Sequence, residues 1–130
     1  MVTKQLSGVP PRDEADVRRA DTLGREIFSG VANKWALLII EALGDDTLRF
    51  SELRNGVEGI SHKMLTQNLR MLERYGLLER TVYPTVPPRV EYTLTGPGRA
   101  LRETIEGLCD WTHRYVGEIE ASCRRFDAGR

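Results

Sequence analysis

The chain has 130 residues, of which 40% are hydrophobic and 29% are charged, with a formal net charge of zero. This size and balance are typical of one globular domain with a buried core. The pI of about 6.7 argues against a protein that coats nucleic acid without sequence preference, because such domains often have a pI above about 9. There is no apolar run of roughly 18 residues and no signal-peptide pattern at the N-terminus, so we expect a cytoplasmic protein with no membrane partner.

The first part of the chain predicts an arm followed by two helices. Residues 1–12 contain one glycine and two prolines and are expected to form a flexible arm, whereas residues 13–130 are expected to form a single domain. A helical pattern begins at Asp13, with Gly24 and Gly30 as candidate break points. "NKWALLIIEALG" predicts the next helix, which begins after Asn33, ends at Gly44 and is apolar on nearly all sides. Such a helix is expected to be buried at the centre of the fold.

A helix-turn-helix pattern occupies the middle of the chain. "DDTLRF" indicates a turn and a very short extended stretch, and "SELRNGVEGI" indicates a short helix capped by Ser51. The following helix, from Ser61 to Tyr75, has Ser61 as its N-cap and Gly76 at the position of a left-handed C-cap. Two short helices separated by a few residues in this way are typical of DNA-binding proteins.

The second helix of this pair carries basic and amide side chains on one side. At about 100° per residue its leucines form one stripe, and the opposite side holds the basic ridge: Lys63, Gln67, Arg70 and Arg74. Arginine and lysine can hydrogen-bond to guanine, glutamine can pair with adenine, and both basic types can neutralise phosphates, so the ridge is predicted to contact DNA. The competing interpretation is an ordinary solvated face.

Other side chains of the same helix complete the predicted contact. Ser61 and the free amides of the helix N-terminus can hold a phosphate. His62 and Thr66 lie on the flanks of the ridge and are included as candidate DNA contacts. Arg74 lies a turn closer to the C-terminus than the rest of the ridge, where its alternative role is to balance the helix dipole.

A predicted β-hairpin follows the second helix directly. "LLERTVY" and "RVEYTLT" alternate apolar and polar residues, and "PTVPP" lies between them, which indicates two antiparallel strands joined by a stiff tip. A hairpin in this position is a wing. Arg89 near the tip is a candidate DNA contact, and its alternative role is to keep an exposed hairpin edge soluble.

A long helix is predicted at the end of the chain. It is capped by Thr95, runs over residues 97–126 and carries apolar residues at near-heptad spacing: Leu101, Ile105, Leu108, Tyr115, Ile119 and Phe126. A helix of this length, about 45 Å, is longer than so small a domain can cover by itself. We therefore expect part of it to pack against another chain. The fold class is mainly α with a small β-hairpin wing (α+β).

Several segments together resemble one family. "NKWALLIIEAL", "LRFSELRNGVEGISHKMLTQNLRMLERYGLLER", "VYPTVPPRVEYTLTGPGRAL" and "LCDW" resemble the HxlR-type, MarR-like winged helix-turn-helix transcriptional regulators of bacteria, over roughly residues 22–115. The resemblance implies a homodimer built from the N- and C-terminal helices, residues 13–43 and 97–126. It also implies that the helix of Ser61 to Tyr75 enters the major groove of double-stranded DNA and that the wing, with Arg89, lies over an adjacent backbone or minor groove.

The cysteines depart from the pattern of this family. Many of its members carry a cysteine about 13 residues before the tryptophan, and some use it to sense oxidants or electrophiles, but Thr22 stands at that position here. The two cysteines present, Cys109 and Cys123, are expected about 21 Å apart along one helix, too far to bridge within it. A thiol switch of the kind found in those relatives is therefore not expected.

Two further candidate sites have weaker support. Cys109 and His113 share a helix face near Asp110, but two ligands do not make a metal site, so a buried cysteine is favoured and no metal or cofactor is expected. Four aromatic residues could line a pocket for a small-molecule effector, although packing in the core or in a dimer is favoured: Phe28, Trp35, Trp111 and Tyr115.

The motifs of common enzyme classes are missing from the sequence. It has no Gly-rich phosphate loop, no nucleophile elbow and no H-E-x-x-H motif, and it contains only two histidines. An enzyme is therefore not expected. The alternative to a sequence-specific regulator is a winged-helix dimeric interaction module, or an effector-binding protein, without specific DNA binding.

Overall fold

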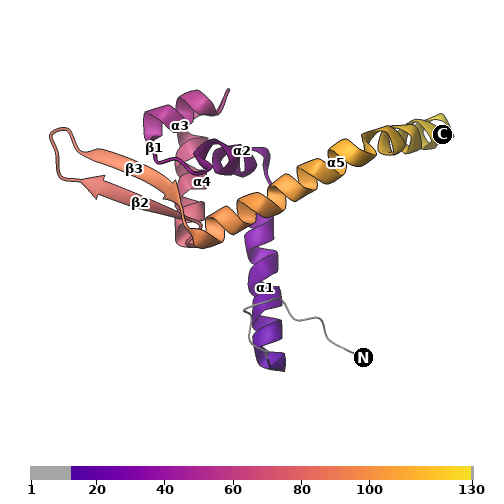
Figure 1. Cartoon of the computed structure of the whole chain (residues 1–130), viewed down its shortest axis with the longest axis horizontal. Coiled ribbons are helices and arrows are strands. Elements are labelled where there is room, and N and C mark those ends of the chain that lie inside the picture. The colour runs from indigo at the N-terminus through magenta and orange to yellow at the C-terminus, as the bar shows by residue number, and fades with distance from the viewer. Residues whose placement is uncertain (1–12, 130) are drawn as a thin grey trace. The chain divides into compact units, whose positions relative to one another are not determined.

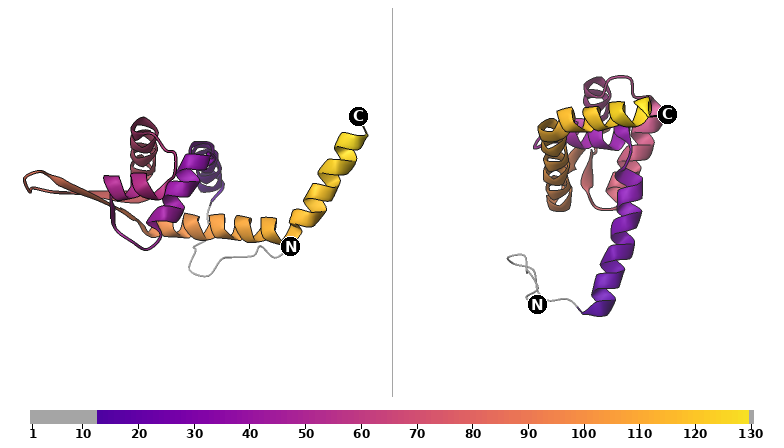
Figure 2. Two further views of the ribbon diagram at one scale, coloured as in Figure 1. Left: turned by 90° about the horizontal axis from the view of Figure 1, so that it is seen from above. Right: turned by 90° about the vertical axis from the view of Figure 1, so that its right-hand side faces the viewer.

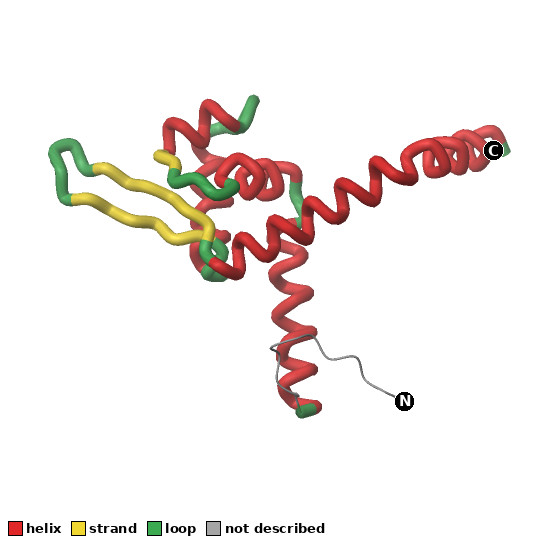
Figure 3. The backbone as a smooth tube through the Cα atoms, in the orientation of Figure 1, coloured by secondary structure: helices red, strands yellow, loops and turns green. Residues whose placement is uncertain are grey.

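A computed structural model of the chain describes residues 13–129. They divide into two compact units, with the boundary between Ala32 and Asn33, and each unit is described by itself. The described residues are mainly helical with one three-stranded antiparallel sheet (Figure 3), which confirms the predicted fold class. The arm expected at residues 1–12 lies outside the described residues, and the single domain expected from residue 13 onwards stays a prediction.

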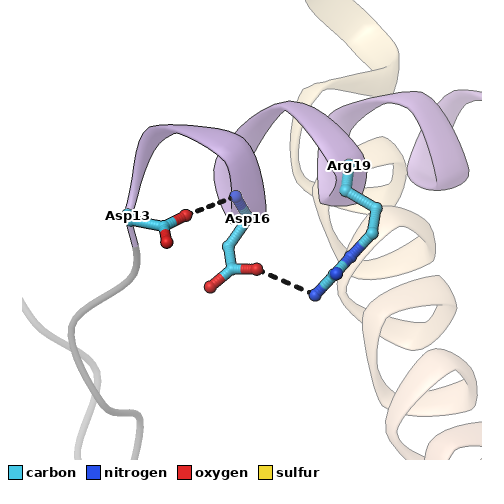
Figure 4. Close-up of polar contacts among 3 residues, drawn as sticks. All are labelled: Asp13, Asp16 and Arg19. Atoms are coloured by element: carbon cyan, nitrogen blue, oxygen red, sulfur yellow. Dashed lines mark hydrogen bonds and ion pairs between the residues drawn. The ribbon is translucent and has the colours of Figure 1, made fainter.

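The described part of the first unit contains helix α1 (Glu14–Val31). The carboxylate of Asp13 caps it by accepting a 2.7 Å hydrogen bond from the amide of Asp16. One turn later the guanidinium of Arg19 pairs with the Asp16 carboxylate at 2.9 Å (Figure 4). These acidic groups lie in the first turn, where they oppose the positive end of the helix dipole. The predicted start of the helix at Asp13 is therefore confirmed.

The two glycines of α1 do not interrupt it. Gly24 and Gly30 both lie inside one continuous helix of 18 residues, so the prediction of break points is wrong. A glycine costs a helix only about 1 kcal/mol relative to alanine. The capped start and the helix-forming residues around Gly24 outweigh that cost.

The second unit contains the helix-turn-helix and the wing. Its elements are α2 (Lys34–Leu43), β1 (Leu48–Arg49), α3 (Phe50–Gly56), α4 (His62–Arg74), β2 (Leu78–Tyr83), β3 (Arg89–Leu94) and α5 (Gly96–Ala128). The strands are ordered β1-β3-β2. The hairpin of β2 and β3 extends away from the helices of this unit (Figure 1). The very short predicted stretch, β1, pairs with β3 through Leu48 and Arg49 and so adds a third strand to the wing.

The core of the second unit lies between α2, α3, α4 and the sheet. Its fully buried large side chains come from every one of these elements: Ile39, Ile40, Leu43, Leu53, Leu65, Leu72, Leu78 and Leu94. Helix α2 contributes one face of this core, but Leu38 on its other side is 41% exposed. Helix α2 contacts α3, α4, α5 and β3, so the prediction of a buried helix at the centre of the fold is confirmed except along the exposed side that carries Leu38.

Helix α3 begins before Ser51, the residue predicted to cap it. It starts at Phe50, and the carboxylate of Glu52 reaches back to accept a 2.8 Å hydrogen bond from the amide of Arg49. Arg49 therefore occupies the N-cap position, and Ser51 lies inside the first turn. The prediction of Ser51 as the cap is wrong: the helix begins one residue before it, and Glu52 takes the N3 position of a capping box, where its carboxylate accepts from the N-cap amide.

Helix α4 has the predicted ends. The Ser61 hydroxyl oxygen accepts a 3.1 Å hydrogen bond from the amide of Met64. At the other end Gly76 adopts φ 70°, in the left-handed region that glycine enters without strain. The amide of Leu77 then donates to the carbonyl of Leu72 at 2.9 Å, as in a Schellman cap. These two caps define the ends of α4.

Helix α5 has 33 residues and is capped by Thr95, close to the predicted range of 97–126. Only its first part is covered by its own chain, through contacts with α2 and β3. Ile105 is its last buried residue, and beyond it almost every side chain is exposed. Cys109 is among the exposed residues, so the prediction that it is buried is wrong.

Helix α5 also changes direction along its length, where its colour passes from orange to yellow (Figure 2). Within α5 the hydroxyl of Thr112 donates a 3.0 Å hydrogen bond to the carbonyl of Leu108, four residues earlier, and such a bond competes with the backbone ladder. The second half of α5 thus extends beyond the fold with its apolar side chains uncovered.

Candidate DNA interface

The two sides of α4 differ sharply in burial. Its leucine stripe is buried against the core, and Asn68 beside that stripe is only 6% exposed. The Asn68 side-chain amide donates to the carbonyl of Met64 at 2.8 Å, so this buried polar group is satisfied. All four side chains of the basic ridge, Lys63, Gln67, Arg70 and Arg74, are exposed. The core packing therefore fixes which side of α4 faces outward, and that side is the basic one.

The flanking candidates are held near the start of α4. The ring of His62 lies 4.7 Å from the ring of Phe50, between centroids, which connects α4 to the first residue of α3. The hydroxyl of Thr66 donates to the carbonyl of His62 at 2.9 Å. Because that bond uses its only proton, Thr66 can offer an external ligand only an acceptor. Ser61 still has its hydroxyl proton available, since its oxygen is the acceptor in the cap.

Arg74 lies in the last turn of α4, where a positive charge opposes the negative end of the helix dipole. Its guanidinium lies 5.2 Å from the centre of the Tyr75 ring, a distance typical of a cation–π contact. This placement supports the alternative role expected for Arg74. The outward groups best placed to reach a ligand are therefore those of the first three turns.

Arg89 sits at the base of the wing tip. It pairs with Tyr83 across the hairpin, and its guanidinium carbon lies 4.4 Å from the centre of that tyrosine ring. Its Nε lies 3.4 Å from a carboxylate oxygen of Glu91. Arg89 is therefore oriented by an aromatic ring and a carboxylate on its own sheet face. Together with Arg49 it lines a hollow of about 580 Å³ beside the wing tip.

Sequence reasoning missed a polar crevice between α4 and the wing. This crevice has a volume of about 240 Å³ and is lined by Phe50, Thr66, Leu69, Arg70, Glu73, Arg80 and Tyr92. Within it Arg80 of β2 pairs with Glu73 of α4, with Nε 3.3 Å from Oε1. The sequence gives one indication of this crevice, because alternation along β2 places Arg80 on the same sheet face as the buried Leu78.

The aromatic residues of α5 lie outside the core. The rings of Trp111 and Tyr115 are 6.1 Å apart and line a hollow of about 680 Å³ together with Ile119. Trp35 does not line this hollow. In residues 13–129 no three His, Cys, Asp or Glu side chains are grouped as a metal site would require. Within the same residues no helix combines the length and apolar character needed to cross a membrane.

Comparisons with known proteins agree with this arrangement. Residues 30–120 match the model of the HxlR-like helix-turn-helix family. The uncharacterised HTH-type transcriptional regulator YtfH of Escherichia coli (strain K12) is 44% identical over 97 residues, which are 75% of this chain and 77% of that protein.

Solved structures show the same fold. The structure of ytfH from Salmonella typhimurium, named as a transcriptional regulator, is 42% identical and superposes with a TM-score of 0.66 over 76% of this chain and 88% of that chain. The redox regulator HypR in its oxidised form is 34% identical, with a TM-score of 0.63 over 71% of this chain and 95% of that chain. The fold is thus a winged helix-turn-helix with a long C-terminal helix. The chain belongs to the HxlR-like helix-turn-helix family, whose members are transcriptional regulators and not enzymes.

Proposed function

We propose that this protein is a cytoplasmic, sequence-specific DNA-binding regulator that acts as a homodimer on a short palindromic operator. The observation that carries the proposal is the basic ridge, because the buried leucines on the opposite side of α4 hold it outward beside a projecting wing. A face needed only for solubility would accept acidic and basic side chains in any order. A helix that reads DNA needs both the outward basic side and the rigid support behind it.

Helix α4 enters the major groove, which is about 12 Å wide and admits one helix. Lys63, Gln67 and Arg70 then face base edges and phosphates. The hydroxyl of Ser61 and the first amides of α4 lie where a phosphate can accept hydrogen bonds. His62 and Thr66 contact the edges of the same groove. Arg89, held by Tyr83 and Glu91, lies over the adjacent backbone or minor groove.

The dimer is supported by the uncovered half of α5. Its large apolar side chains are exposed within one chain: Leu108 by 59%, Trp111 by 52%, Val116 by 46% and Phe126 by 66%. Water is a poor environment for a continuous apolar stripe of this kind, and a second copy of the same helix covers it symmetrically. A stable dimer of this type should bury more than about 1,000 Å² in total.

Helix α1 offers a second apolar surface for the same dimer. Val17, Leu23 and Phe28 are 45%, 47% and 71% exposed. All three lie along α1 and are exposed among the described residues. We assign them to the dimer interface together with α5, as the resemblance to the family implied.

The proposal is tested with duplexes selected from a random-sequence pool by the purified protein. Fluorescence anisotropy then measures the affinity for the selected duplex and for a scrambled duplex of equal composition. At physiological salt we expect at least about a thousandfold preference for the selected duplex. Equal binding to both duplexes, or none at low salt by a folded dimer, would instead favour the interaction module without specific DNA binding.

A further inference from the structure

Packing of α4 against the wing does not by itself explain the charged side chains that line the crevice between them. This crevice brings two guanidinium groups, Arg70 and Arg80, to one hollow beside the hydroxyl-bearing ring of Tyr92. Glu73 is the one carboxylate that lines it. The crevice therefore holds a net charge of about +1 among its ionised groups. A hollow with this lining suits a small oxyanion better than an apolar ligand.

The two arginines of the crevice differ in how firmly they are held. Arg80 pairs with Glu73 at 3.3 Å, with side-chain exposures of 44% and 38%. Solvent-exposed pairs of this kind contribute little, typically below about 1 kcal/mol, so the pair can open at small cost. Among residues 13–129 no carboxylate lies within ion-pair distance of Arg70. Arg70 is thus ready to bind an anion, and Arg80 can be recruited.

Tyr92 adds a neutral hydrogen-bond donor. Its residue is only 9% exposed, and burial raises the pKa of its hydroxyl above the usual range, while the nearby Arg80 opposes that shift. The hydroxyl therefore keeps its proton at neutral pH. Arg80 and Tyr92 pair directly across β2 and β3, so both side chains lie on the sheet face that meets α4.

The position of the crevice identifies the anion. In duplex DNA a single sugar-phosphate strand separates a major groove from the adjacent minor groove. A protein that places α4 in one groove and the wing over the other must straddle that strand. The crevice lies between these two elements, since its lining comes from α4, β2 and β3 and from Phe50 at the start of α3. In that arrangement the phosphates of the strand pass over the opening of the crevice.

We propose that the crevice binds a phosphodiester of the strand between the two grooves, held by Arg70, Arg80 and the hydroxyl of Tyr92. This inference rests on the proposed function. On binding, Arg80 leaves Glu73 for the phosphate, and no covalent bond changes. In this arrangement Arg70 contacts the DNA backbone, and Lys63 and Gln67 are left to contact bases. The competing explanation is structural, with the pair of Arg80 and Glu73 serving only to tie α4 to β2.

The first experiment measures the salt dependence of binding for Arg80→Ala and Arg80→Lys on selected and scrambled duplexes. Each lost phosphate contact should reduce the slope of log K against log salt by about 0.9, and the two crevices of a dimer by about 1.8. Arg80→Ala should show this reduction and an equal fractional loss of affinity on both duplexes. Arg80→Lys should keep the slope, because lysine is also a phosphate ligand.

The second experiment removes the competing carboxylate. Glu73→Gln frees Arg80 and removes a repulsive charge, so affinity should rise about two- to fivefold on both duplexes, in line with the strength of an exposed ion pair. Glu79→Gln is the matched control, because Glu79 is exposed and lies beside Arg80 on the opposite face of β2. It changes the net charge equally but should leave affinity close to that of the wild type.

The outcomes separate this inference from the proposed function. An unchanged slope for a folded Arg80→Ala dimer, or an equal or reduced affinity for Glu73→Gln, would overturn the phosphate crevice while specific binding by the wild type still stands. If the wild type binds no DNA at all, both the proposed function and the crevice are refuted. Thermal unfolding of each variant identifies a loss of affinity that follows from a loss of folded protein.

Discussion

A single charge placed in the stripe of α5 should dissociate the dimer. Ile119 lines the hollow next to Trp111 and is 37% exposed within one chain. Burying a whole isoleucine side chain contributes about 1.5 to 3 kcal/mol, so the exposed third contributes roughly 0.5 to 1 kcal/mol for each copy. Ile119→Glu loses this contribution twice in a symmetric dimer and also buries two carboxylates, at several kcal/mol each.

The sum is at least about 4 kcal/mol, which raises the dimer dissociation constant roughly a thousandfold. The fold of the chain should survive, because no side chain of α5 beyond Ile105 is buried in it. Light scattering at micromolar concentration should give a monomeric mass for Ile119→Glu and a dimeric mass for the wild type. DNA binding should weaken in parallel, since one half-site alone gives much less affinity.

His113→Glu is the matched control for this prediction. His113 is exposed on the same helix, about 120° around its axis from Ile119, and the substitution adds the same negative charge. It should remain dimeric. A dimeric Ile119→Glu with normal circular dichroism would refute the assignment of the α5 stripe to the interface. Dissociation of both variants would show that overall charge, and not the stripe, controls assembly.

Four further predictions concern two basic residues, the two cysteines and one glycine. Lys63→Ala should lose about 1 to 3 kcal/mol of binding free energy on the selected duplex, and less on random DNA, if Lys63 contacts a base. An equal loss on both duplexes, measured by anisotropy, would mean that Lys63 contacts a phosphate. Arg89→Ala should weaken binding to all sequences, or lose preference at flanking A·T pairs if the wing enters a narrow minor groove; binding curves identical to those of the wild type would exclude it from the interface. The double variant Cys109→Ser, Cys123→Ser should keep operator binding and its response to any natural signal, and loss of that response would point to a thiol bridge between subunits. Gly98→Ala should be strongly destabilised in urea, because a Cβ there would overlap the backbone carbonyl oxygen of Leu77. Unchanged stability would mean that the backbone shifts freely at this contact.

Local signals allowed the sequence to predict α4 almost residue for residue. Ser61 and Gly76 act within their own turns, and the leucine stripe needs only the helical period. The basic ridge follows from the same period. The start of α3 was misplaced because two local signals compete there, and the carboxylate of Glu52 prevails over the hydroxyl of Ser51.

The features that the sequence did not predict depend on contacts between distant segments. The crevice requires Arg80 to meet Glu73 across two different elements, and strand alternation alone does not say which helix faces the strand. The pairing of β1 with β3 is likewise non-local. The exposure of Cys109 was missed because an apolar stripe looks the same in sequence whether its own chain or a partner covers it.

A base-resolution protection footprint on the selected duplex shows whether α4 reads a major groove in a symmetric dimer. We predict two major-groove patches related by a dyad, with centres about 34 to 36 Å apart or a multiple of that spacing. Lys63→Ala should remove protection at a defined base in each patch. Uniform weak protection by an intact dimer, or a single patch without a symmetric counterpart, would show that α4 does not read DNA in this way.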